Sequence, residues 1–179
     1  MPTISGGEKL RQRLDNLAHK VKKATTVRVG FLEGSGYPNG TSVPMVAAIQ
    51  EFGAPKAGIP PRPYFRTMVK AKSPEWPEAI AGLLQKTNYD AVATLASMGE
   101  GIAGQLRQSI VDTFEPPLSP ITLMLRKMRA EKPDLIVTRR TVGEAARRIK
   151  AGEAPDGVST KPLIDTGHLL QTIDYEVKS

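Results

Sequence analysis

The chain lacks the residue types on which several classes of protein depend. Its 179 residues include no cysteine and only two histidines, His19 and His168. The absence of cysteine excludes disulfide frameworks, cysteine-ligated zinc and thiol catalysis, and two histidines argue against a His-rich metal site. Aromatic residues make up 5% of the chain and form no RNA-recognition pattern. We therefore expect no cofactor and no metal, and find no sign of sequence-specific nucleic-acid readout.

Long apolar runs and catalytic motifs are missing as well. No segment approaches the ~20 apolar residues that cross a bilayer, and the first residues, MPTISGGEKLRQRL, contain no apolar stretch typical of a secretory signal. The loop at 34–40, GSGYPNG, lacks the Lys-Ser/Thr pair of a phosphate-binding loop. No GxSxG, HExxH or EF-hand pattern occurs. We expect no membrane partner and no enzymatic activity. A hydrolase would need a Ser, His or carboxylate site that no motif indicates.

Positive charge is present, and it is concentrated in two blocks. The net charge is +7. Residues 1–30 contribute +5 and residues 120–150 contribute +6, while the remaining residues together contribute −4. Such asymmetry is typical of proteins with an anionic partner, nucleic acid included. Solvated helix faces would give the same pattern, because Lys and Arg are mostly exposed in any protein. If the blocks line a DNA channel, the candidate contacts are Lys20, Lys22, Lys23, Arg139, Arg140, Arg147 and Arg148.

Periodicity predicts a mostly helical chain with a strand near each end. Apolar spacing of three and four residues indicates helices at 8–23, 43–53, 64–71, 73–86, 89–114, 120–130 and 141–150. Alternation predicts strands at 26–33 and 172–179, and a short strand at 135–137. Pairing of the two terminal strands would tie the chain ends together. The sequence thus predicts one α+β domain over 1–179, with a small, mainly antiparallel sheet packed by several helices, the longest near 89–114. Residues 118–161 have the character of an insertion and match no motif.

Three local features of these helices are also expected. Leu10, Leu14, Leu17 and Val21 would form one apolar stripe on the first helix. Ser42 suits the N-cap of the second helix, Ser73 that of the helix at 73–86, and Asp165 or Thr166 that of a short helix near the C-terminus. In the long helix, the small residues Gly99, Gly101 and Gly104 would allow another segment to approach closely.

The segment at 54–63, APKAGIPPRP, reads as an extended loop because its four prolines exclude regular helix or central strand. Arg and Tyr dominate interface hot spots, and they are the residue types of Arg62, Tyr64 and Arg66. Phe, the type at position 65, is enriched at interfaces. We expect Arg62 to be exposed, so that Arg62→Glu spares the monomer but blocks assembly. The alternative for Phe65 and Met68 is that they anchor the loop in the subunit's own core.

Three segments in order resemble a known family. They are VRVGF at 27–31, VAAIQEFG at 46–53 followed by IPPRPYFR at 59–66, and PLIDTGHLL at 162–170 before a strand. This order resembles the tail-completion or minor tail proteins of long-tailed bacteriophages, which help to join the tail to the head.

The resemblance implies a small α+β structural subunit with no catalytic residues to carry over. It implies self-assembly into a ring, commonly a hexamer, next to tail-tube and head–tail connector proteins, in the tail or neck of the virion after assembly in the host cytoplasm. Packaged DNA could then contact the basic blocks. The alternative function is a basic nucleic-acid-binding module without enzymatic activity. Candidate interface residues are Glu51, Phe52, Arg62, Tyr64, Phe65 and Arg66.

Overall fold

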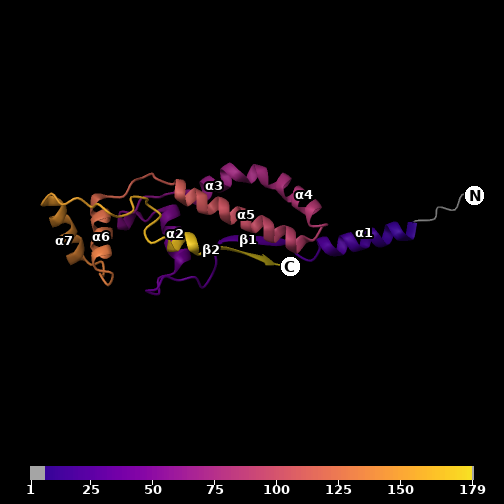
Figure 1. Cartoon of the computed structure of the whole chain (residues 1–179), viewed down its shortest axis with the longest axis horizontal. Coiled ribbons are helices and arrows are strands. Elements are labelled where there is room, and N and C mark those ends of the chain that lie inside the picture. Colours follow the sequence, from indigo (N-terminus) through magenta and orange to yellow (C-terminus); the bar gives the residue numbers. More distant parts are fainter. Residues whose placement is uncertain (1–6, 179) are drawn as a thin grey trace, which may run out of the picture.

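The computed structural model describes residues 7–178, and these confirm the predicted α+β class. A two-stranded antiparallel sheet packs against helices, the longest of which is α5 (Ala91–Asp112). The molecule is elongated, with α1 at one end and α6 and α7 at the other (Figure 1). The sheet, α5 and the C-terminus lie between these ends.

The sheet pairs the strand that follows α1 with the last strand of the chain, as the alternating sequences predicted. Strand β1 (Thr26–Phe31) pairs with β2 (Ile173–Lys178) in a register that places Thr26 opposite Lys178 and Phe31 opposite Ile173. Val27 and Tyr175 lie on the face that packs on α5, where Gly99 is buried against both side chains. Of the three glycines expected to permit close packing, only Gly99 does so, since nothing lies near Gly101 or Gly104.

The main apolar core lies where α2 (Val43–Phe52), α3 (Tyr64–Lys72) and α5 meet. Its buried members are Val43, Ala47, Tyr64, Met68, Ala103, Leu106, Ile110, Leu163, Leu169 and Ile173. The predicted cap is confirmed, since the Ser42 side chain accepts a hydrogen bond from the Met45 N–H. This core fixes the ends of α2 and α3, from which the candidate interface residues project.

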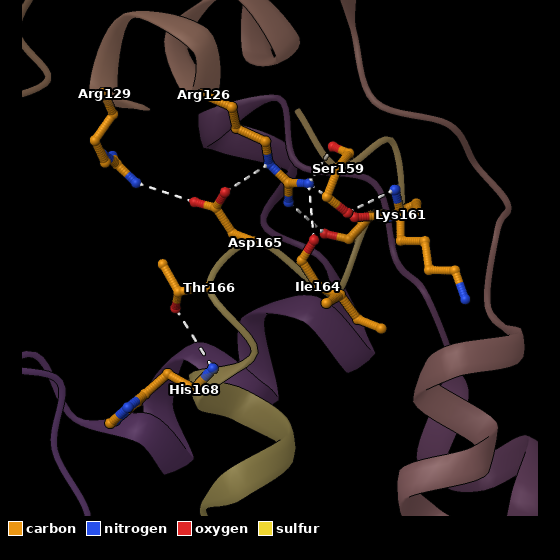
Figure 2. A network of polar contacts seen from close by, with 9 residues as sticks. Arg126, Arg129, Ser159, Lys161, Ile164, Asp165, Thr166 and His168 are labelled. Carbon is orange, nitrogen blue, oxygen red and sulfur yellow. Dashed lines mark hydrogen bonds and ion pairs between the residues drawn. The ribbon is translucent and has the colours of Figure 1, made fainter. Parts of the chain in front are cut away.

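Two other predicted caps are wrong. Ser73 begins a single 3₁₀ turn, η2 (Ser73–Glu75), and α4 (Trp76–Lys86) starts three residues later with no side-chain cap. The short helix α8 (His168–Gln171) begins after Gly167, whose φ of 80° makes the turn. Neither Asp165 nor Thr166 therefore holds the N-cap position of α8. Asp165 points to two arginines, and Thr166 lies one residue before the cap, where its Oγ1 accepts the His168 N–H at 3.4 Å (Figure 2).

The segment 118–161 contains α6 (Pro120–Glu131) and α7 (Arg139–Lys150), which confirm both predicted helices. They form a second, smaller core around Met124, Met128 and Ala145. The strand predicted at 135–137 is wrong. This segment is instead the connection between the two helices, in which Leu135 packs on their core and Ile136 is 76% exposed.

Helix α1 (Gly7–Val21) has no buried residue. It extends away from the rest of the molecule (Figure 1), and the whole predicted stripe is exposed, from 59% at Leu10 to 37% at Leu17. The sequence correctly predicted a helix with an apolar side, but nothing in the described part of the chain covers that side.

Candidate functional site

The proline-rich segment between α2 and α3 folds back over the end of α2. It includes a 3₁₀ turn, η1 (Pro55–Ala57). Gly53 starts the reversal with φ 78°, and a Cβ there would lie 2.8 Å from the Pro61 nitrogen, so only glycine fits. The Arg62 N–H then donates to the Gln50 carbonyl at 2.7 Å. The segment is therefore held against its own helix instead of presenting a free extended edge.

Glu51 binds the start of α3. Its carboxylate accepts the Phe65 N–H at 2.8 Å, the Arg66 N–H at 3.2 Å and the Arg66 Nε at 2.7 Å. The first N–H groups of a helix have no partner within the helix and favour negative charge. The Glu51 side chain is only 6% exposed, so it joins α2 to α3 within the subunit.

Arg62 and Tyr64 are also buried, which makes the expectation of an exposed Arg62 wrong. Arg62 is 4% exposed, and it donates from Nε to the Pro116 carbonyl at 3.0 Å and from Nη1 to the Gln50 Oε1 at 3.2 Å. Burial, and then the neighbouring Arg126, lower the pKa of Arg62. Tyr64 is 2% exposed and donates its hydroxyl to the Ala47 carbonyl. Arg62→Glu would bury an unpaired carboxylate, so it should destabilise the monomer itself.

The exposed part of this region is centred on Phe52. Its ring is 64% exposed, and the Arg66 guanidinium carbon lies 5.0 Å from the ring centroid. Beside it is a shallow hollow of about 280 Å³, lined mainly by the apolar side chains of Phe31, Pro44, Phe52 and Phe65. We call this surface the Phe52 hollow. Of the six candidate interface residues, Phe52, Phe65 and Arg66 thus form the accessible lining of the hollow. Glu51 and Tyr64 lie buried at its base, and Arg62 is buried outside it.

Sequence reasoning missed Arg126, which organises the segment PLIDTGHLL. Its Nη1 donates to the carbonyls of Ser159, Lys161 and Ile164 at 2.7, 2.9 and 3.0 Å, and its Nη2 donates to that of Pro162 at 3.2 Å. Asp165 lies 3.4 Å from the Arg126 Nε and 3.2 Å from Arg129 (Figure 2). Burial is the main cause that lowers the pKa of Arg126. This network attaches α6 to the loop before α8.

His168 and Asp165 have different partners and do not act as a pair. Its Nε2 lies 3.1 Å from the Gly36 carbonyl, to which it donates, and its ring centroid lies 4.6 Å from that of Tyr37. Burial, and then Asp165, raise the pKa of Tyr37. A cavity of about 350 Å³ lies beside these groups. Its charged lining groups, Arg126, Arg129 and Asp165, pair with one another, and His168 bonds to backbone, which is the arrangement of a structural joint.

The structure does not bring the two predicted groups of DNA-contacting residues together. Lys20, Lys22 and Lys23 lie at the end of α1, whereas the four arginines lie on α7 at the opposite end of the molecule (Figure 1). The Lys20 Nζ donates to the Asn88 carbonyl at 3.3 Å. Arg148 forms ion pairs with Glu131 and Glu153 at 2.9 and 3.4 Å, so its charge is already compensated.

Comparison with known proteins gives no relative: no family model, no curated protein and no solved structure matches the chain. In residues 7–178, no helix is both long and apolar enough to cross a membrane. Over the same residues, no three His, Asp or Glu side chains are grouped as metal ligands would be.

Proposed function

We propose that this chain is a structural subunit that completes the tail of a long-tailed bacteriophage or joins the tail to the head, acting as one member of a ring. The observation that carries the proposal is the apolar stripe of α1, which no described residue covers. The order of VRVGF, QEFG, IPPRPYFR and PLIDTGHLL, which resembles that of tail-completion proteins, supports the same function.

The stripe has the spacing of a helix that packs against another surface. Leu10, Leu14, Leu17 and Val21 follow one another by four, three and four residues, and this spacing keeps apolar side chains on one seam. A 15-residue helix is about 22 Å long. Exposed apolar patches with polar rims usually mark interaction sites, and here the rim is formed by Arg11, Arg13 and Lys20.

The Phe52 hollow is a second apolar surface, separate from the α1 stripe. If the two surfaces bind each other on neighbouring subunits, the contact is head-to-tail, and such contacts close into rings or continue as filaments. The Glu51 and Arg62 contacts hold α2 and α3 rigidly behind this hollow, which lowers the conformational cost of docking. Both features suit a ring subunit with tail-tube and connector proteins as neighbours.

The test is the mass of the purified protein, measured alone and with tail-tube protein. We expect a mass of several chains in at least one of the two samples. Leu14→Glu places a charge in the apolar stripe and should reduce that mass to a single chain without lowering the melting temperature, since Leu14 is 57% exposed. Gln12→Glu, on the opposite side of α1, adds the same charge and should leave the mass unchanged. A single-chain mass in both wild-type samples would refute the proposal.

A further inference from the structure

Helix α7 has one apolar side and one cationic side. Ala145 is fully buried and Ile149 partly buried in the small core shared with Met124 and Met128 of α6. The outer side carries Arg139, Arg140, Arg147 and Lys150, all of them exposed. We call these four residues the α7 cation face. The packing of α7 thus uses its larger apolar residues within the subunit, and its exposed positions hold these four cations together with Gly143, Glu144 and Ala146.

The charges of the α7 cation face are not compensated inside the subunit. No ion pair within residues 7–178 involves any of the four. The neighbouring cations Arg126, Arg129 and Arg148 each pair with a carboxylate. Self-compensating ion pairs would be a sufficient explanation for a basic helix, but these four residues form none, and the exposed side of α7 carries a single acid, Glu144.

The spacing of the cation face suits a close approach to an extended polyanion. Arg139, Arg147 and Lys150 recur at helical spacing over the twelve residues of α7, and the first and last are separated by about 16 Å of helix axis. Gly143 lies between Arg139 and Arg147 on this face, and a Cβ there would meet nothing within 4 Å. Glycine in a helix interior costs about 1 kcal/mol relative to alanine, and here it leaves no side chain between the cations, so that the Arg147 Nε donates to the Gly143 carbonyl at 3.4 Å.

We infer that the α7 cation face binds the phosphate backbone of duplex DNA without reading its sequence. A lipid surface is disfavoured because Ala146 is the sole apolar residue among the exposed positions of α7, whereas lipid binding requires a large apolar side. Single-stranded nucleic acid is disfavoured because α7 has no aromatic side chain on which bases could stack. This inference does not rest on the proposed ring, because a monomer presents the face as well.

The two basic blocks therefore have different roles. The cations of α1 surround an exposed leucine stripe, which indicates a protein partner, whereas α7 itself carries no exposed large apolar residue, the nearest being Ile136 and Val137 in the connection before it. Arg148 does not belong to the DNA-binding face because it is paired with Glu131 and Glu153. Lys150, which sequence reasoning did not select, does belong to it.

The test is the salt dependence of binding to a random-sequence duplex, measured by fluorescence anisotropy on the full chain. Release of counterions by four phosphate contacts gives a log–log slope of about −3.6, or about a 150-fold loss of affinity between 50 and 200 mM salt. Replacing the whole α7 cation face with Gln should reduce the magnitude of this slope by about three to four. The matched control removes the same charge from the other block: Lys9, Arg11, Arg13 and Lys22→Gln. It should leave most of the slope, and an equal reduction by both variants would overturn the inference.

A single substitution at Gly143 tests the position of the face. Gly143→Glu places a carboxylate among the cations and should reduce the magnitude of the salt slope by about one. Gly143→Gln adds a side chain of similar size without charge and should retain the slope. Both variants should preserve the helix, because Glu and Gln are better helix formers than Gly. Identical affinities of the two variants for the duplex, or equal binding of poly-glutamate at matched charge, would overturn the assignment to DNA.

Discussion

Arg62, Tyr64 and Glu51 have the chemistry of interface residues, but the subunit uses them internally. A buried guanidinium must find acceptors, and Arg62 finds a backbone carbonyl of the loop after α5 and the Gln50 side chain on α2. Glu51 satisfies backbone N–H groups of α3 in the same way. Residue type alone therefore fails to separate an anchor for a partner from an anchor for the subunit's own loop, because both require the same hydrogen-bonding capacity.

Tyr64 gives the stability a pH dependence in the alkaline range. Burial, and then Glu51 and Tyr37, raise the pKa of Tyr64 above its usual value near 10. Because the folded pKa is raised, the contribution of Tyr64 is fully present below pH ~10, where the unfolded phenol is neutral, and is lost as pH rises toward the folded pKa. Tyr64→Phe should cost about 1 kcal/mol at pH 7 through loss of the bond to Ala47. This deficit should shrink above pH 10 and then reverse.

Urea unfolding of both proteins between pH 7 and 11.5 measures this crossover. Tyr89→Phe is the control for the loss of a phenol at a less buried position, since Tyr89 is 37% exposed. A Tyr64→Phe deficit that stayed constant to pH 11.5 would contradict the prediction.

At the scale of elements, α5 depends on one glycine out of three. Gly99 is the point at which the helix meets the sheet: a Cβ there would lie 2.7 Å from the Tyr175 ring and 2.8 Å from the Val27 side chain. Gly101 and Gly104 face open space. Glycine has the same intrinsic helix cost at all three positions. Their different surroundings alone should therefore decide whether alanine raises or lowers the free energy of unfolding.

Gly99→Ala should therefore destabilise the protein by about 1–3 kcal/mol, because the sheet must shift to accommodate the methyl group. Gly101→Ala and Gly104→Ala should each stabilise it by up to about 1 kcal/mol, since alanine favours the helix and meets nothing. Thermal unfolding of the three single variants provides the comparison. Stabilisation by Gly99→Ala would show that α5 and the sheet do not pack as described.

At the scale of the whole molecule, two apolar cores are joined largely by polar contacts. The main core lies around α2, α3 and α5, and the smaller one between α6 and α7. Arg126 links them by donating to four carbonyls of residues 159–164 and by pairing with Asp165. The position of the α7 cation face relative to the sheet thus depends largely on this buried side chain, with the exposed pair of Arg129 and Asp165 as a second contact.

Arg126→Gln should weaken this joint. Its side chain is 9% exposed, so the loss of charge-assisted bonds to buried carbonyls should cost about 3 kcal/mol. Hydrogen exchange should increase in α6, α7 and residues 159–165 while the sheet stays protected. Arg129→Gln is the matched control, because Arg129 is 44% exposed and pairs with Asp165 alone, which limits its effect to about 1 kcal/mol. Uniform exchange over the whole chain in Arg126→Gln would show that the two cores unfold as one.

The sequence by itself determined the α+β class, the pairing of the terminal strands, and every helix of ten or more residues to within a few positions. These features follow from apolar periodicity, which is local along the chain. It misassigned 135–137, because the β-branched residues Ile136 and Val137 favour a strand only where a partner strand is available.

Only the tertiary structure decided which polar side chains are inside and which apolar ones are outside. Arg62 and Arg126 are buried because they donate to loop carbonyls that are far away in the sequence and would otherwise lack a hydrogen-bond donor. No local sequence pattern indicates which carbonyls these are. The tertiary structure also left the α1 stripe uncovered, and it separated the two basic blocks to opposite ends of the molecule. Burial is a property of the packed chain, so it emerges only when distant segments meet.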